Sequence, residues 1–203
     1  MSRILVVQSS PNLGASLSRA LSNAFVDRFV ARHAGTTVVT RDLVAEAIPH
    51  LSEDRLQALS AAPEALTPAQ QAAVALSDRL IDEIRDADMI VIGVPCYNLS
   101  IPSSLKAWID QIVIPNRSFR YTEAGPVGLM TGKKVYIFIT SGSVYSQGPE
   151  KPHDFALPLL QGILTFIGLS DMTVVRAEGM GAMPDQAARI VAQARAEAER
   201  LAD

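Results

Sequence analysis

Residues Asp86–Asp110, DADMIVIGVPCYNLSIPSSLKAWID, contain a buried strand, a polar loop and a helix in direct succession. Met89–Val94 is an almost continuous apolar run, which is typical of a strand covered on both faces of a parallel sheet. Pro95 ends this run, the loop Cys96–Ser100 follows, and Pro102 marks the start of a helix. Ligands of open α/β sheets bind at the carboxyl ends of the strands. We therefore expect this loop to form half of a ligand site.

The composition is that of a single globular domain. The chain has 203 residues, 48% of them hydrophobic, and no linker or low-complexity tract divides it, so residues 1–203 are predicted to form one domain. A net charge of −3 gives no footprint for nucleic acid, and no apolar run is long enough to span a membrane. Cys96 is the single cysteine, and the chain enters a strand at once rather than a signal peptide. We expect a cytoplasmic protein.

Strand and helix patterns alternate along the whole chain. The predicted strands are Arg3–Val7, Thr37–Thr40, Met89–Val94, Lys134–Thr140 and Thr173–Arg176. The predicted helices are one from about Ser16, then Thr67–Ala87, Ser103–Ile112, Asp154–Ile167 and Pro184–Leu201. This alternation predicts an α/β fold with a doubly wound parallel sheet, for which we choose the strand order 2-1-3-4-5. The switch point of that order lies between the first and third strands.

Two segments fall outside this alternation. Arg41–Pro63 contains Pro49 and a short helical pattern, and we expect it to pass over the edge of the sheet. Val113–Gly132 is irregular and long for a simple connection, so we expect it to be functional or to cover another part of the molecule.

The loop after the first strand is rich in hydroxyl groups and leads into a helix. Free backbone N–H groups and the helix dipole favour an anion at such a position. The loop, which holds Ser10, Asn12 and Ser16, has no lysine and no G-x-G-x-x-G, so it is neither a P-loop nor a dinucleotide fingerprint. A monophosphate held by neutral donors fits best. The alternative is a capped helix in which the serines serve only the turn.

Two further loops follow the third and fourth strands. Tyr97 and Asn98 offer a flat side chain and an amide that can line the edge of a planar heterocycle. Alternatively, Tyr97 packs on the next helix. Cys96 has no neighbouring His or Lys, so we interpret it as a small buried thiol rather than a nucleophile. Ser141–Ser143 are placed to meet the same heterocycle from its far side.

No side chain is predicted to be catalytic. The sequence pattern shows no Ser-His-Asp arrangement and no paired carboxylates, and the histidines His33, His50 and His153 lack the spacing of metal ligands. We expect His153 to be solvated rather than catalytic. A cofactor would therefore carry the chemistry while the protein binds and orients it.

At this point the run from Pro95 to Asp110, PCYNLSIPSSLKAWID, closely resembles the FMN-dependent NADH:azoreductase family, relatives of the quinone reductases. Members typically show P-M-Y-N-F followed by a similar S-I-P-S-x-L-K run. Leu66–Gln71, Phe119–Lys134 and Phe166–Gly168 also look like family features, so the resemblance spans nearly the whole chain. It implies a flavodoxin-like three-layer sandwich with a five-stranded parallel sheet.

The resemblance also implies which residues contact FMN and substrate. The expected phosphate contacts are Ser10, Ser16, Leu17 and Ser18. The expected contacts along the flavin ring are Cys96, Tyr97, Asn98 and Leu99, with Ser141, Gly142, Ser143 and Val144 on its pyrimidine side. The expected substrate pocket holds Phe119, Tyr121 and Phe166, although Phe166 is equally well interpreted as a core residue of its helix.

Three positions depart from the family pattern. Cys96 replaces the usual methionine and Leu99 the usual phenylalanine, which trims the apolar cover over the flavin. Gly142–Val144 replaces a pattern that commonly ends in paired glycines. A valine does not adopt a positive φ cheaply, so the backbone at Val144 is expected to differ from that of the family.

The resemblance implies an enzyme that reduces quinones and aromatic azo compounds by two-electron hydride transfer. NADH or NADPH would reduce FMN, leave, and be replaced by the acceptor on the same flavin face, which predicts ping-pong kinetics. The resemblance further implies a homodimer whose protomers form each pocket jointly. The rival hypotheses are a flavodoxin-like FMN electron carrier without NAD(P)H activity and a flavin-free regulatory domain. The mild charge and the extra segments argue against a carrier.

Overall fold

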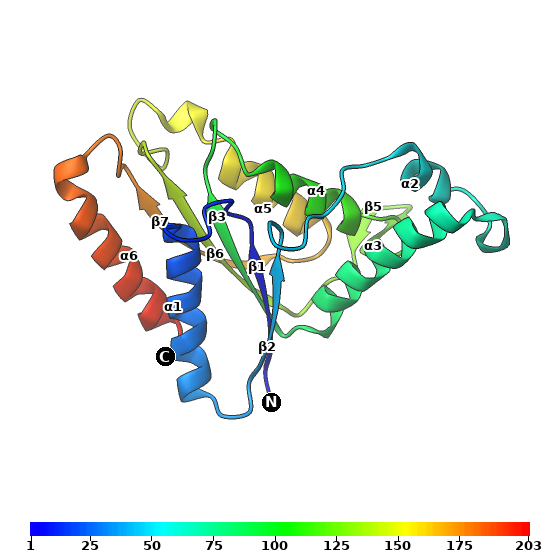
Figure 1. Cartoon of the computed structure of the whole chain (residues 1–203), viewed down its shortest axis with the longest axis horizontal. Coiled ribbons are helices and arrows are strands. Elements are labelled where there is room, and N and C mark those ends of the chain that lie inside the picture. The colour runs from blue at the N-terminus through cyan, green and yellow to red at the C-terminus, as the bar shows by residue number, and fades with distance from the viewer.

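A central sheet of five parallel strands has the order β2-β1-β3-β6-β7 (Figure 1). The computed structural model describes residues 1–203. The strands are β1 (Arg3–Gln8), β2 (Thr37–Asp42), β3 (Met89–Pro95), β6 (Lys134–Ser141) and β7 (Asp171–Glu178). Numbered among themselves, these strands have the predicted order 2-1-3-4-5, which is confirmed. The winding reverses between β1 and β3, and all four pairings in the sheet are parallel.

Helices cover both faces of the sheet and make it the middle of three layers (Figure 1). The helices are α1 (Leu17–Arg32), α2 (Glu53–Ala58), α3 (Pro68–Asp86), α4 (Ser103–Ile112), α5 (Ala156–Phe166) and α6 (Ala187–Leu201). Short 3₁₀ turns lie at Pro63–Ala65, Lys151–His153 and Pro184–Gln186. Helices α1 and α6 pack on one face, and α3, α4 and α5 pack on the other. None of these helices combines the length and the apolar character needed to cross a membrane.

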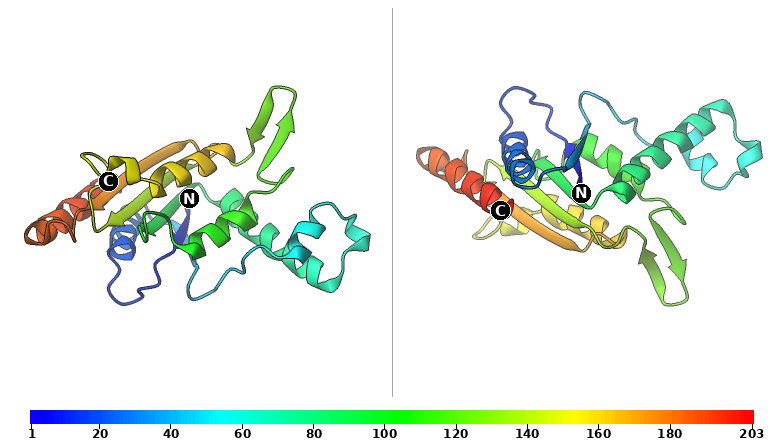
Figure 2. Two further views of the ribbon diagram at one scale, coloured as in Figure 1. Left: turned by 90° about the horizontal axis from the view of Figure 1, so that it is seen from above. Right: turned by 90° about the horizontal axis from the view of Figure 1, so that it is seen from below.

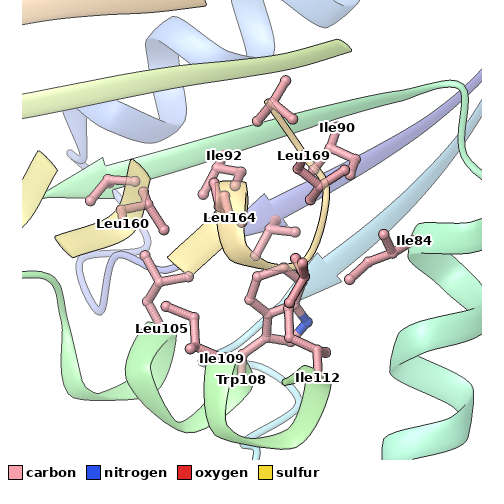
Figure 3. Close-up of a cluster of buried hydrophobic side chains, with 14 of the residues drawn as sticks. Ile84, Ile90, Ile92, Leu105, Trp108, Ile109, Ile112, Leu160, Leu164 and Leu169 are labelled. Atoms are coloured by element: carbon pink, nitrogen blue, oxygen red, sulfur yellow. The ribbon is translucent and has the colours of Figure 1, made fainter. Parts of the chain in front are cut away.

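Two hydrophobic clusters lie on the two faces of the sheet. The larger one contains Trp108 of α4, which packs among side chains of β3 and α5 such as Ile92 and Leu164 (Figure 3). The smaller one places Phe25 of α1 against Phe138 of β6, with 5.6 Å between the ring centroids. Strand β3 is buried at every position, as its continuous apolar sequence predicts.

The helix starts follow their capping residues. Ser16 caps α1 by accepting from the amide of Arg19. Thr67 and Gln70 form the complete capping box predicted for α3, with Pro68 in the first helical position. Pro158 is the third residue of α5, in the first turn, where its missing N–H breaks no helical hydrogen bond.

The segment that was expected to be irregular instead contains an antiparallel hairpin. Strands β4 (Phe119–Thr122) and β5 (Gly125–Gly128) pair with each other and with no strand of the main sheet. Gly125 supplies the positive φ of 111° that the turn requires. The prediction was wrong here because each strand has only four residues and β5, Gly-Pro-Val-Gly, consists mainly of residues that disfavour strands. Strand β7 is also longer than predicted, since its polar ends still pair with β6.

The hairpin and the excursion that carries α2 project from the body on the same side (Figure 2). The excursion includes the predicted short helix, α2, which packs along α3. The base of the hairpin touches the end of α5, where the backbones of Gly128 and Gly168 meet. The excursion begins at the carboxyl end of β2, whereas the hairpin follows α4, where the chain returns toward the amino end of β6 (Figure 1).

Candidate functional site

The loops after β1, β3 and β6 meet at the carboxyl edge of the sheet. The Cys96 amide donates to the Thr140 carbonyl at 2.7 Å, and the Ser104 hydroxyl donates to the Ser9 carbonyl at 3.2 Å. Between the loops lies a hollow of about 190 Å³. It is lined by Ser10, Asn12, Ala15, Ser16, Leu17, Pro95, Cys96, Tyr97, Thr140, Ser141, Gly142 and Met180. Parallel strands thus bring together residues that are more than 120 positions apart in the sequence.

The first loop is shaped by its own short polar side chains. The Ser10 hydroxyl, which is buried, accepts from the Asn12 amide at 3.3 Å, and the Asn12 side chain accepts from the Ala15 amide at 3.0 Å. The Ser16 and Ser18 hydroxyls lie 3.1 Å apart. The loop therefore presents hydroxyls and the amino end of α1 to the hollow, a combination that favours an anion. Ser18 itself is fully buried and does not line the hollow.

An ion pair behind this loop was not predicted. Arg19 donates to the Ser10 carbonyl through Nε at 3.1 Å and through Nη2 at 2.7 Å. The same guanidinium binds both carboxylate oxygens of Asp42 at 2.6 and 2.9 Å. The hydrogen bonds from Arg19 lower the pKa of Asp42 to about 2. An arginine in the first turn of a helix is unfavourable, because its positive charge opposes the helix dipole. This was the one feature of the sequence that could have indicated an ion pair at Arg19.

The second loop is a tight two-residue turn. Tyr97 and Ser100 exchange both backbone hydrogen bonds at 3.0 Å, and both residues between them are left-handed, with φ of 50° at Asn98 and 67° at Leu99. These are the features of a type I′ turn. A branched side chain in this region is strained, so Leu99 marks a local conflict between sequence and backbone.

Tyr97 stands between two hollows. Besides the first one, it lines a wider hollow of about 790 Å³ that opens toward the segment after β2. Asn98 lines the wider hollow only, and Leu99 lines neither. The ring of Tyr97 is 42% exposed, so it does not pack fully on the next helix and is free to contact a ligand.

The thiol of Cys96 is half-buried beside Tyr97. Burial raises its pKa, and the carboxylate of Asp154 raises it further, outweighing a hydrogen bond from the Leu99 backbone. A neutral thiol is a poor nucleophile, which agrees with its interpretation as a small half-apolar lining group.

The third loop is held by the segment after β7. The Gly142 carbonyl accepts from the amides of Gly181 and Ala182, both at 2.9 Å, and the Ser141 hydroxyl donates to the Ser143 carbonyl at 2.7 Å. Ser141 and Gly142 line the hollow, whereas Ser143 does not. Val144 has no positive φ and lies in a separate hollow between β7 and α6, so this chain does not bring its side chain to the site.

The predicted substrate residues lie elsewhere. The Phe119 ring is buried, with its centroid 4.6 Å from Phe166 and 5.3 Å from Tyr121. All three belong to the hairpin or to the end of α5, and none of them lines either hollow at the three loops. Phe166 is 36% exposed, so it is not simply a core residue. One chain alone therefore does not unite these rings with the carboxyl-edge hollow.

The titratable groups give no alternative chemistry. No group of three His, Cys, Asp or Glu side chains could hold a metal ion. His153 lies on the surface, with Nδ1 2.9 Å from a Glu150 carboxylate oxygen, which agrees with a solvated histidine. The lining of the first hollow contains no carboxylate and no lysine or arginine. Neutral donors at a helix amino end thus remain as its chief chemistry.

These features define a mononucleotide-binding protein of the flavodoxin-like class, and the family model described as "Flavodoxin-like fold" matches residues 2–202. An FMN-dependent NADH:quinone oxidoreductase of Herminiimonas arsenicoxydans is 48% identical over 180 residues, 89% of this chain and 88% of the relative. The enzyme of the same name from Azospirillum brasilense is 44% identical and covers 98% of this chain and 97% of its own length. The chain belongs to the FMN-dependent NADH:quinone oxidoreductase family.

A solved structure supports the same assignment. The azoreductase of Bacillus anthracis str. Sterne superposes with a TM-score of 0.93 at 32% identity, over 100% of this chain and 99% of that one.

The donor set of the site fits FMN. The hydroxyls of Ser10 and Ser16 and the amino end of α1 suit a phosphate, because they donate hydrogen bonds and bring no opposing negative charge. Tyr97 and the backbone groups of the second and third loops suit a flat ring with polar edges.

Proposed function

We propose that this chain is an FMN-dependent oxidoreductase that takes electrons from NADH or NADPH and reduces quinones and aromatic azo compounds. The observation that best supports this function is that three loops converge on a hollow, which offers neutral hydrogen-bond donors at the amino end of a helix. The names of the relatives and the azoreductase structure point to the same reaction.

The roles of the residues follow from their positions. FMN, when bound, supplies the hydride chemistry, so no side chain needs to act as an acid, base or nucleophile. Ser10 and Ser16 hold the phosphate, and the Arg19–Asp42 pair fixes the Ser10 carbonyl and with it the shape of the loop. Tyr97 and Cys96 line the ring, while Ser141 and Gly142 contact its polar edge. Donor and acceptor use one exposed face in turn, which gives ping-pong kinetics.

A homodimer completes this proposal. The projecting hairpin and excursion expose apolar side chains, among them Tyr121 at 72%, Leu56 at 54% and Leu59 at 48%. A second copy of the chain would bring Tyr121 and Phe166, with the buried ring of Phe119 packed behind them, to a pocket that they do not reach within their own chain. Each pocket would then contain three loops of one protomer and aromatic side chains of the other. The lone cysteine fits the reducing cytoplasm, where we place the protein.

The deciding experiment is anaerobic reduction of the FMN-loaded protein, followed by visible spectroscopy. Addition of NADH or NADPH should bleach the flavin bands within the dead time or seconds, and a quinone should restore them. Initial rates at varied NADH and quinone should give parallel double-reciprocal lines. Flavin that stays oxidised with both nicotinamides would favour an electron carrier, and intersecting lines would exclude a single shared site.

A further inference from the structure

The excursion contains a largely buried arginine that forms no ion pair. Arg55 of α2 is 4% exposed, yet no carboxylate lies within 4 Å of its guanidinium. Its Nε donates to the Ser77 hydroxyl of α3 at 3.0 Å, and its two terminal nitrogens donate to no protein group. Buried charges in proteins are normally paired. The terminal nitrogens of Arg55 are not among the fully buried atoms that lack a partner, so they remain open to a ligand in the adjoining cavity. The pKa of Arg55 is lowered by this burial.

The polar groups around Arg55 are already in use. The Ser77 hydroxyl donates to the Gln111 side chain at 2.9 Å, and the Gln111 amide donates to the Pro49 carbonyl at 3.1 Å. The nearest acid, Asp78, is bound to Arg117 at 2.6 Å. Arg55 therefore holds the excursion to α3 through its Nε alone. This hydrogen bond leaves the two terminal nitrogens of Arg55 without a protein acceptor.

Arg55 lines a cavity of about 200 Å³ between α2, α3 and the segment Ile114–Arg117. Its charged walls are Arg55, Arg117 and Asp78, which leave one net positive charge, and Asn116 is a further polar wall. Its remaining walls are mainly apolar and include Ala58, Val74 and Ile114. The cavity is smaller than a typical pocket for a drug-sized ligand, so it has room for a small molecule.

We propose that this cavity, called here the Arg55 cavity, binds a small organic monocarboxylate. The two terminal nitrogens of a guanidinium form a planar fork that matches two carboxylate oxygens. One negative charge neutralises the surplus, and a small apolar body fills the space beside Val74 and Ile114. The Arg55 cavity shares no lining residue with the three-loop hollow, so this binding does not use the proposed FMN site.

The test is calorimetric titration of the FMN-loaded protein with benzoate, and with benzamide as the neutral isostere, at constant ionic strength. Benzoate should saturate one site per chain, and benzamide should give no saturable heat. Arg55→Gln should weaken benzoate binding at least tenfold. Arg79→Gln is the matched control, since Arg79 is an exposed arginine of α3 outside the cavity, and it should change the Kd less than twofold.

A second variant keeps the test decisive if Arg55→Gln does not fold. Val74→Phe fills the cavity while leaving the arginine in place, and it should abolish benzoate binding. The flavin spectrum should not change during the titration. The proposal is overturned if wild-type protein binds no benzoate, if Arg55→Gln binds it unchanged, or if benzoate perturbs the flavin bands. Loss of the dimer in Arg55→Gln without benzoate binding by the wild type would instead assign the cavity to a second copy of the chain.

Discussion

Arg19 and Asp42 lie 23 positions apart in sequence and meet in a two-pronged ion pair, with N–O distances of 2.6 and 2.9 Å. Asp42 ends β2, and it also accepts from the amides of Val44 and Ala45. The pair therefore joins the loop after β1 to the segment after β2. Its position behind the Ser10 carbonyl makes it a support for the proposed phosphate site and not a ligand itself.

Loss of this pair should weaken FMN binding. In Asp42→Asn, Arg19 keeps a hydrogen-bond partner but loses its counter-charge, so the Ser10 loop should loosen. We expect the Kd of FMN to rise about tenfold, equivalent to about 1.4 kcal/mol, measured by fluorescence quenching. Asp82→Asn, at an exposed pair on α3, is the control and should leave the Kd unchanged. Equal losses in both variants would refute the supporting role.

The same pair predicts a pH dependence of stability. The pKa of Asp42 in the folded protein, about 2, lies below its ordinary value of 3.8, so Asp42 binds its proton more weakly in the folded state. The stabilisation is therefore fully present above pH 4 and is lost as the pH falls from about 4 to 2. It should amount to about 1–2 kcal/mol after allowance for partial exposure. Urea unfolding at pH 3 and pH 6 should show a smaller difference in Asp42→Asn than in the wild type.

The left-handed backbone at Leu99 predicts that a smaller residue is more stable there. Glycine adopts φ of 67° without strain, so Leu99→Gly should stabilise the protein by about 0.5 kcal/mol. The relief of strain in the folded state should exceed the free energy lost because glycine makes the unfolded chain more flexible. Leu13→Gly, at an exposed leucine with no positive φ, should instead destabilise it by about 0.5–1 kcal/mol. Urea unfolding measures both changes in the free energy of unfolding. If both variants were destabilised, or both stabilised, the backbone at Leu99 would not be strained.

The contact between Gly128 and Gly168 predicts opposite effects for two Gly-to-Ala changes. A Cβ at Gly128 would lie 2.1 Å from the Gly168 nitrogen, so Gly128→Ala should cost about 2–3 kcal/mol or detach the hairpin. Gly162→Ala, on the open face of α5, should stabilise the helix by about 0.5–1 kcal/mol. Thermal unfolding separates the two. An unchanged midpoint for Gly128→Ala would show that the hairpin does not pack as described.

The proposed dimer predicts a functional effect from the distant aromatic side chain of Tyr121. Tyr121→Ser should lower kcat/KM for a bulky quinone about tenfold while leaving the Kd of FMN unchanged. Arg120→Ser, next to it on the hairpin and also exposed, should have little effect on either. Light scattering should find two chains per particle. A monomer with full quinone activity would rule out the shared pocket.

The thiol of Cys96 should react slowly with alkylating agents. Its pKa is raised by burial and by Asp154, so the reactive thiolate is scarce at neutral pH. The rate with iodoacetamide at pH 8 should be at least about tenfold below that of free cysteine, and FMN should lower it further. A rate equal to that of free cysteine would mean that the loop opens readily.

The layered fold could be predicted from sequence because its signals are local. Continuous apolar runs such as Met89–Val94 identify buried strands, and the capping residues Thr67 and Gln70 identify the start of α3. The positions of the three loops follow from parallel pairing alone. Parallel pairing therefore predicts that Ser10, Ser16, Tyr97, Ser141 and Gly142 lie at one edge of the sheet, and all five line the hollow there.

The features that escaped prediction depend on residues far apart in the chain. The Arg19–Asp42 pair needs β1 and β2 to be adjacent, and the close approach of Gly128 to Gly168 needs α5 to end beside the hairpin. The left-handed turn at Leu99 contradicts the preference of its own side chain. Phe119 lies away from the carboxyl edge because α4 returns the chain toward the amino ends of the strands before the hairpin begins.

The three loops at the carboxyl edge are each fastened by backbone or side-chain hydrogen bonds to a neighbouring element, through Ser9, Thr140 and Gly142. Their conformational entropy is thus already lost when the chain folds. An incoming cofactor has little further ordering to impose, so its association should release heat without a large entropic penalty. Amide hydrogens in these loops should exchange slowly even in the protein stripped of FMN.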